Sequence, residues 1–160
     1  MPRPTAVLFV CLGNICRSPL AEAAFRLAAG QAGLDVEADS AGTGDWHRGS
    51  APDPRARAVA RANGAPIDHY RARQIVAADF ERFDHVFVMD HANLTDALLV
   101  VPDGARTRPA LLLDLVPGCE GQPVADPYYG GTADFDRTWD EVSRAAVALV
   151  DRIVAERGPT

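Results

Sequence analysis

The chain has 160 residues, a length typical of one domain that can bury a hydrophobic core. Its formal net charge is -6, and all 16 of its cationic side chains are arginine. An acidic chain without a basic run is a poor match for broad nucleic-acid binding or for an anionic membrane surface, and a chain without lysine excludes Schiff-base chemistry and a lysine-centred phosphate loop.

The first half of the chain alternates between strand and helix patterns. Residues 5–10 are a short apolar run typical of a buried strand, and 36–41 form a second strand candidate. Between them, residues 19–32 have apolar side chains at helical spacing. Residues 42–54 are rich in Gly, Pro and Asp, which predicts a loop, and a helix over 54–62 follows.

The second half continues the alternation and ends in a long amphipathic helix. The predicted elements are a short helix at 77–82, a strand at 85–89, a helix at 91–99, a strand at 108–115, a loop at 117–132 and a helix at 135–156. Strands that alternate with helices indicate one α/β domain over 1–160, with a parallel sheet flanked by helices. Ligands bind such sheets at the carboxyl ends of the strands, so we expect the loops after Val10, Ala41, Met89 and Leu115 to share one functional rim.

The three cysteines are Cys11, Cys16 and Cys119. Three is too few for a disulfide framework or for a four-ligand zinc site, and this favours a reducing compartment. The apolar run that begins at Ala6 is too short for a signal-peptide core or a membrane span. We therefore expect a cytoplasmic protein.

The loop after the first strand combines a nucleophile with a cation. Cys11 is followed six positions later by Arg17, and Gly13 and Asn14 between them can adopt positive φ, so that backbone N–H groups converge. Ser18, followed by proline, has the signature of a helix N-cap. The loop can therefore hold an anion with its N–H groups and the positive end of a helix.

Each side chain of this loop has a chemical role in that interpretation. A thiol at Cys11 would be stabilised as the thiolate nucleophile by the N–H groups and the helix end. Arg17 has a planar fork that matches two phosphate oxygens, and Ser18 can donate its hydroxyl to the thiolate. The ordinary alternative is a buried cysteine at a strand end beside a simple N-cap serine.

The order and spacing of five segments resemble the low-molecular-weight protein tyrosine phosphatase family over nearly the whole chain. The segments are 11–18, 40–46, Asp68-His69, Met89-Asp90 and 126–129. The resemblance implies a three-layer α/β fold of the phosphotyrosine protein phosphatase I type with a four-stranded parallel sheet. It also implies a metal-independent hydrolase without cofactor, which forms a phosphocysteine on Cys11.

The resemblance assigns further residues around the nucleophile. Asp126 would be the general acid and then the general base. The residues that would contact substrate are Leu12, Gly13, Asn14, Ile15, Cys16, Trp46, Tyr128 and Tyr129, of which the three aromatic ones would form walls that admit phosphotyrosine and exclude shorter phosphoserine.

Supporting roles follow from the same resemblance. Ser40 and His69 would brace Asn14 in a left-handed conformation, and Asp90 at the end of the third strand would orient Arg17. Cys16 is either a small buried hydrophobe or a redox partner that traps oxidised Cys11 as a disulfide.

The expected partners are phosphotyrosine-containing proteins and small aryl phosphates, with inorganic phosphate as the product and with no nucleic acid or membrane. Arsenate reductases share the fold but need further cysteines, which 78–97 lacks. Arginine phosphatases of the family have threonine at the position of Ile15. A phosphotyrosine-binding module without activity would need neither Cys11 nor Asp126.

Overall fold

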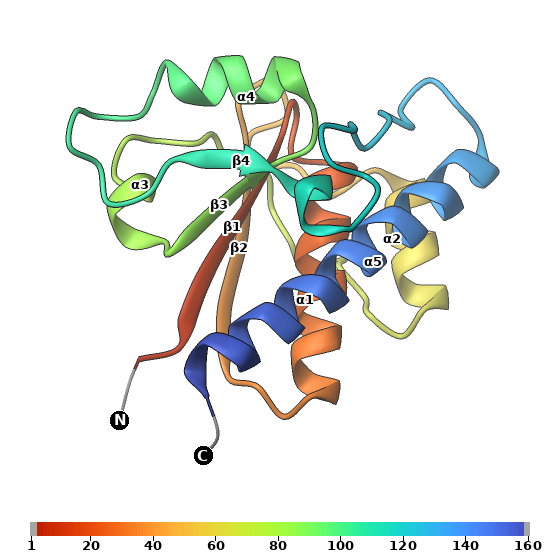
Figure 1. The fold of residues 1–160 in the computed structure, drawn as a ribbon. Coiled ribbons are helices and arrows are strands. Elements are labelled where there is room, and N and C mark those ends of the chain that lie inside the picture. Colours follow the sequence, from red (N-terminus) through yellow and green to blue (C-terminus); the bar gives the residue numbers. More distant parts are fainter. Residues whose placement is uncertain (1–2, 159–160) are drawn as a thin grey trace.

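The computed structural model describes residues 3–158 and has a four-stranded parallel sheet at its centre (Figure 1). The strand order is β2-β1-β3-β4, and the strands are β1 (Thr5–Cys11), β2 (Val36–Gly42), β3 (His85–Val88) and β4 (Pro109–Leu111). The parallel pairing brings the carboxyl ends of β1, β2 and β3 to one edge of the sheet. The three-layer α/β fold predicted from the sequence is confirmed.

Helices cover both faces of the sheet (Figure 1). The helices are α1 (Arg17–Gln31), α2 (Pro54–Ala62), α3 (Asp79–Arg82), α4 (His91–Leu98), the 3-10 helix η1 (Leu112–Leu115) and α5 (Thr132–Arg157). Helices α1, α2 and α5 pack on one face, whereas α3 and α4 pack on the other. Among residues 3–158, no helix has the length and apolar character that a membrane crossing requires.

Strand β1 is buried on both faces, which explains its uninterrupted apolar sequence. Because side chains alternate along a strand, Val7 and Phe9 face the layer of α1 and α5, while Leu8 and Val10 face the layer of α3 and α4. The Phe9 ring lies 5.6 Å from the ring of Phe25, which is fully buried on α1. This packing fixes α1 behind the strand, and with it the loop that joins the two.

The predicted strand at 108–115 is wrong in its second half. Only Pro109–Leu111 pairs with β3, and the chain then turns into η1. Leu111, Leu112 and Leu113 are all buried in succession, and a short apolar run of this kind does not distinguish a strand from a buried helical turn.

Two helices begin earlier than predicted. Helix α5 begins at Thr132 rather than at residue 135, because the Asp134 carboxylate accepts a hydrogen bond of 2.8 Å from the N–H of Gly131 and stabilises an earlier first turn. Helix α1 begins at Arg17 with Cys16 as its N-cap residue, so Ser18 lies inside the helix and is not the cap that the sequence predicts. Its hydroxyl is engaged in the loop instead.

We expect Phe25→Ala to lower the free energy of unfolding by about 3–5 kcal/mol, because it leaves a cavity between β1 and α1. Urea denaturation followed by circular dichroism measures this change. Leu99→Ala is the control: this side chain is 83% exposed, and the expected change is within about 0.5 kcal/mol. Equal effects of the two substitutions would contradict this account of the core.

Candidate active site

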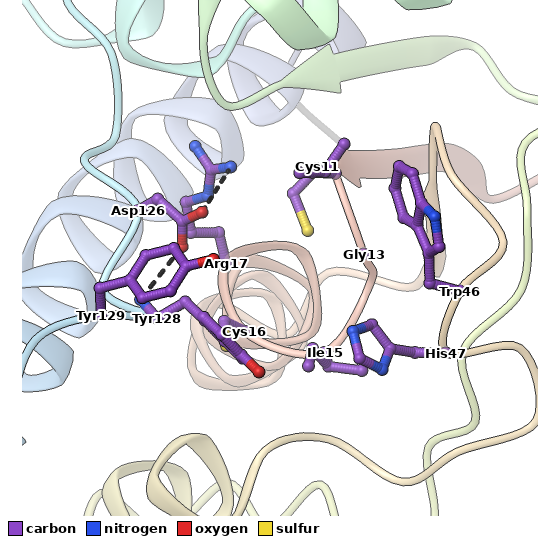
Figure 2. A pocket seen from close by; sticks show the side chains of 11 residues that line it. Cys11, Gly13, Ile15, Cys16, Arg17, Trp46, His47, Asp126, Tyr128 and Tyr129 are labelled. Atoms are coloured by element: carbon purple, nitrogen blue, oxygen red, sulfur yellow. Dashed lines mark hydrogen bonds and ion pairs between the residues drawn. The ribbon is translucent and has the colours of Figure 1, made fainter.

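A pocket of about 220 Å³ opens at the carboxyl end of β1 (Figure 2). Its floor is the β1–α1 loop (residues 12–16), together with the last residue of β1 and the first of α1. The pocket is lined by Cys11, Leu12, Gly13, Ile15, Cys16, Arg17, Trp46, His47, Asp126, Tyr128 and Tyr129. The structure therefore brings together side chains from three distant parts of the chain.

Cys11 lies at the base of the pocket and is 3% exposed. Its Sγ is 3.0 Å from the hydroxyl oxygen of Ser18, which is fully buried. The side-chain amide of Asn14 donates to the same hydroxyl at 2.8 Å, so the proton of Ser18 is left to point towards the sulfur or towards the carbonyl of Ala41. This arrangement suits a negatively charged sulfur.

Asn14 belongs to the β1–α1 loop but is buried and does not line the pocket, although the resemblance predicts that it contacts substrate. It has φ of 59°, the left-handed conformation that the sequence predicts there, and within residues 3–158 no other residue except glycine has positive φ. Its side-chain oxygen accepts a hydrogen bond of 3.0 Å from the backbone N–H of Arg73. Arg73 is itself held by ion pairs with Asp39 and Asp79, each at 3.0 Å.

The prediction that Ser40 and His69 brace Asn14 is wrong. The side chain of Asn14 forms its hydrogen bonds with Ser18 and with the backbone of Arg73. Ser40 is buried beside the carboxyl of Glu22, and burial raises the pKa of that carboxyl above its usual value. The exposed ring of His69 packs edge-to-face on Tyr70 and lines a different hollow. Tyr70 occupies the half-buried position next to Glu22, where burial raises the pKa of its hydroxyl, and His69 is left at the surface.

Arg17 is a buried cation with three partners. Its Nη1 donates to the Asp90 carboxylate at 2.7 Å and to the carbonyl of Val124 at 3.0 Å, and its Nη2 lies 3.7 Å from the Asp126 carboxylate. Burial opposes the charge, but the facing Cys11 and the two carboxylates hold the pKa of Arg17 above its ordinary value. The guanidinium is therefore a fixed positive charge beside the pocket.

Asp126 reaches the pocket from the segment before α5. One of its oxygens accepts a hydrogen bond of 3.1 Å from the N–H of Tyr128, and the other is the oxygen near Arg17. Its side chain is 41% exposed. The carboxyl group is thus held at the pocket and remains open to water.

Aromatic side chains form two walls that stand apart (Figure 2). The rings of Tyr128 and Tyr129 contact each other edge-to-face at 4.9 Å on the side of Asp126. Trp46 stands on the opposite side, and its ring covers Gly44, where an added Cβ would lie 1.9 Å from the ring. Trp46 is 70% exposed and Tyr129 is 93% exposed, which leaves a slot between flat apolar surfaces.

Cys16 is 5% exposed in the same loop. Burial raises the pKa of its thiol far above the usual range, and the nearby Asp53 and Cys11 add to this effect. Cys16 is therefore a neutral thiol at physiological pH.

The sequence interpretation missed three groups at the site. They are the carbonyl of Val124, which holds Arg17; the backbone of Arg73, which holds Asn14; and the ring of His47, which packs over Gly13. Two of these act through the backbone, which carries no signal in residue type. Among residues 3–158, no three side chains of His, Cys, Asp or Glu gather in a group that could hold a metal ion.

Substitutions of Asn14 separate the strain of its backbone from its hydrogen bonds. Both Asn14→Gly and Asn14→Ala remove the bonds to Ser18 and Arg73, and both residues have to adopt the left-handed conformation, but only the Cβ of alanine is strained in it. We expect Asn14→Ala to lower the free energy of unfolding by about 1–2 kcal/mol more than Asn14→Gly. Urea denaturation of both variants tests this, and equal stability would show that the conformation carries no strain.

Comparisons with known proteins agree with this geometry. The family model described as "Low molecular weight phosphotyrosine protein phosphatase" matches residues 6–158. A low molecular weight phosphotyrosine protein phosphatase of Schizosaccharomyces pombe is 45% identical over 138 residues, which cover 84% of this chain and 88% of the relative.

Solved structures have the same fold. A protein tyrosine phosphatase of Entamoeba histolytica superposes with a TM-score of 0.89 at 35% identity, over 96% of this chain and 99% of that one. A Drosophila arginine phosphatase superposes with a TM-score of 0.84 at 30% identity, over 92% of this chain and 96% of that one. On these matches, the chain belongs to the low molecular weight phosphotyrosine protein phosphatase family.

Proposed function

We propose that this protein hydrolyses phosphotyrosine in proteins through a covalent phosphocysteine on Cys11. One observation carries the proposal: the Cys11 sulfur lies at the base of a pocket to which Arg17 and Asp126 also contribute. A thiol, a fixed cation and a carboxyl group in one concave site are the groups that in-line displacement at phosphorus requires. We further propose that residues 1–160 form a single low-molecular-weight phosphatase domain.

In the first step the Cys11 thiolate attacks phosphorus, so that an S–P bond forms as the P–O bond to the tyrosine breaks. Arg17 holds two of the three equatorial oxygens with its planar fork, while N–H groups of the β1–α1 loop hold the third. Asp126 gives its proton to the departing phenolate oxygen. The products of this step are free tyrosine hydroxyl and phosphocysteine.

In the second step water attacks the same phosphorus. The Asp126 carboxylate takes a proton from the water, the S–P bond breaks and inorganic phosphate leaves. The electron pair of the S–P bond returns to Cys11, where the hydroxyl of Ser18 at 3.0 Å can donate to the sulfur and stabilise the leaving thiolate. No metal or cofactor takes part in this scheme.

The walls favour phosphotyrosine as substrate. Trp46 and Tyr128 stand on opposite sides of the pocket, and a phosphorylated aromatic ring can pass between them to reach the buried sulfur. A phosphoserine is too short to reach the sulfur from the same surface.

Arginine phosphatase is the second candidate, because a Drosophila arginine phosphatase has the same fold. Ile15, which lines the pocket here, stands where arginine phosphatases of the family have threonine, and the larger side chain favours the flat aryl ester.

A reducing compartment keeps Cys11 as a thiol, and we therefore place the activity in the cytoplasm.

Substitutions of Cys11 and Asp126 test the mechanism with para-nitrophenyl phosphate in the presence of EDTA. We expect full activity in wild type, none in Cys11→Ser, and a decrease in kcat of about 10²–10⁴-fold in Asp126→Ala with little change in KM. Retained activity in Cys11→Ser, or loss of wild-type activity on metal removal, would contradict the scheme.

The same assay on phosphopeptides tests the substrate class. Rates on phosphotyrosine should exceed those on phosphoserine and phosphoarginine peptides of the same flanking sequence. A preference for phosphoarginine would select the second candidate, and binding of phosphotyrosine peptide without turnover would indicate a binding module.

We also propose that Cys16 protects Cys11 from irreversible oxidation. Peroxide converts the Cys11 thiolate to sulfenic acid, and the Cys16 sulfur then attacks it to form a disulfide with release of water. Attack requires the thiolate of Cys16, and burial raises the pKa of that thiol, so the disulfide should form faster as the pH rises above neutral.

We expect peroxide to inactivate the protein, a dithiol to restore it, and mass spectrometry to find the peptides of Cys11 and Cys16 linked. In Cys16→Ser, recovery should fail because Cys11 proceeds to sulfinic acid. Equal recovery of this variant and wild type, with no linked peptide in wild type, would refute the role.

A further inference from the structure

We propose that Arg55 positions the general acid, by clamping the segment 126–131 to the β1–α1 loop. The inference rests on the proposed function, since it assigns a partner to Asp126. Arg55 is the second residue of α2, and its side chain leaves the helix N-terminus towards the segment that precedes α5.

The guanidinium of Arg55 donates to two carbonyls of this segment. Its Nη2 is 2.9 Å from the carbonyl oxygen of Tyr128, and its Nη1 is 2.9 Å from that of Gly130. Residues 128–134 are otherwise exposed to solvent. Two hydrogen bonds from one planar group therefore restrain a part of the chain that has little burial of its own.

Tyr128 connects the clamp to the acid. Its carbonyl accepts from Arg55, while its N–H donates to the Asp126 carboxylate at 3.1 Å. Movement of Tyr128 would release the hydrogen bond that orients the carboxyl group. The remaining oxygen of Asp126 would then lose its place beside Arg17.

Arg55 is held rigidly enough to act as a clamp. The carboxylate of Asp53 binds it through both oxygens, with distances of 3.0 Å to Nε and 3.0 Å to Nη2. The guanidinium also lies over the buried ring of Phe135, 4.6 Å from its centroid, and over the ring of Tyr128 at 5.8 Å. These contacts fix the plane of the fork, which a lysine ammonium could not reproduce.

Asp53 joins this assembly to the floor of the pocket. Its backbone N–H donates to the carbonyl of Ile15 at 2.9 Å, and its side chain caps α2 through the N–H of Arg55 at 2.8 Å. Asp53 and Arg55 therefore connect the loop that carries the nucleophile with the segment that carries the acid. The distance between sulfur and carboxyl group depends on this connection.

The test uses Arg55→Lys and Arg55→Met, with Arg61→Met as the matched control. Arg61 lies on the same helix, is exposed, and pairs with Asp68 at 2.7 Å. Phenyl phosphate needs an acid for its leaving group, whereas 2,4-dinitrophenyl phosphate does not. The ratio kcat/KM reports the steps up to departure of the leaving group.

For both Arg55 variants we expect kcat/KM to fall by about 10–100-fold on phenyl phosphate and by less than about 3-fold on 2,4-dinitrophenyl phosphate. Arg61→Met should match wild type on both. In the Asp126→Ala background, Arg55→Met should have no further effect, because the two residues act in one unit. Equal losses on both esters, or losses that add to those of Asp126→Ala, would show a structural role only and overturn the proposal.

Amide hydrogen exchange provides a readout that does not depend on activity. Exchange over 126–131 should be faster in Arg55→Met than in wild type and unchanged in Arg61→Met. Unchanged exchange in Arg55→Met would overturn the clamp. A wild-type protein that hydrolyses neither ester would instead defeat the proposed function, and the exchange result would still decide whether Arg55 holds the segment.

Discussion

The pairing of the buried Arg17 is the interaction on which the site depends. Its guanidinium is 3% exposed, in a chain with a net charge of -6. A buried charge is tolerated only when it is paired, and Arg17 is paired with Asp90 at the end of β3 and with the carbonyl of Val124. Arg17 and these two partners come from three parts of the chain, which the fold brings together beside the carboxyl ends of β1 and β3. The sheet therefore serves the arginine as much as the nucleophile.

The site divides into a buried frame and exposed walls. The side chains of Asn14 in the loop and of Ser18 in α1 are buried, and they set the shape of the loop around Cys11 through hydrogen bonds that water cannot replace. Trp46 and Tyr129 are largely exposed and depend on little of the core. In the proposed function, chemistry and substrate choice are thus assigned to different residues, and changes in the walls need not disturb the frame.

Residue types predicted the features that depend on neighbouring residues in the sequence. They did not predict the contacts that depend on how distant parts of the chain pack together. The apolar run of β1 was sufficient to predict the strand, and Asn14 to predict the left-handed residue after it, because both properties are local. Positive φ was also expected at Gly13, and this was wrong. His69 was expected at Asn14, but the adjacent Tyr70 fills the half-buried place beside Glu22. The sequence carried no signal for the contact of Arg55 with the segment 126–131, since the groups that it binds there are backbone carbonyls more than 70 residues away.

Three carboxylates near the pocket would repel a phosphate if they were free. Asp90 is paired with Arg17, and Asp53 is paired with Arg55, whose hydrogen bonds overcome the effect of burial and hold the pKa of Asp53 below its usual value. Of the three, Asp126 has the longest ion pair, with one oxygen 3.7 Å from Arg17. The two arginines thus neutralise Asp90 and Asp53, and leave Asp126 more weakly paired, as the general acid of the proposed mechanism requires. An acidic chain can bind a dianion on this basis, because the local pairing of charges decides the potential in the pocket.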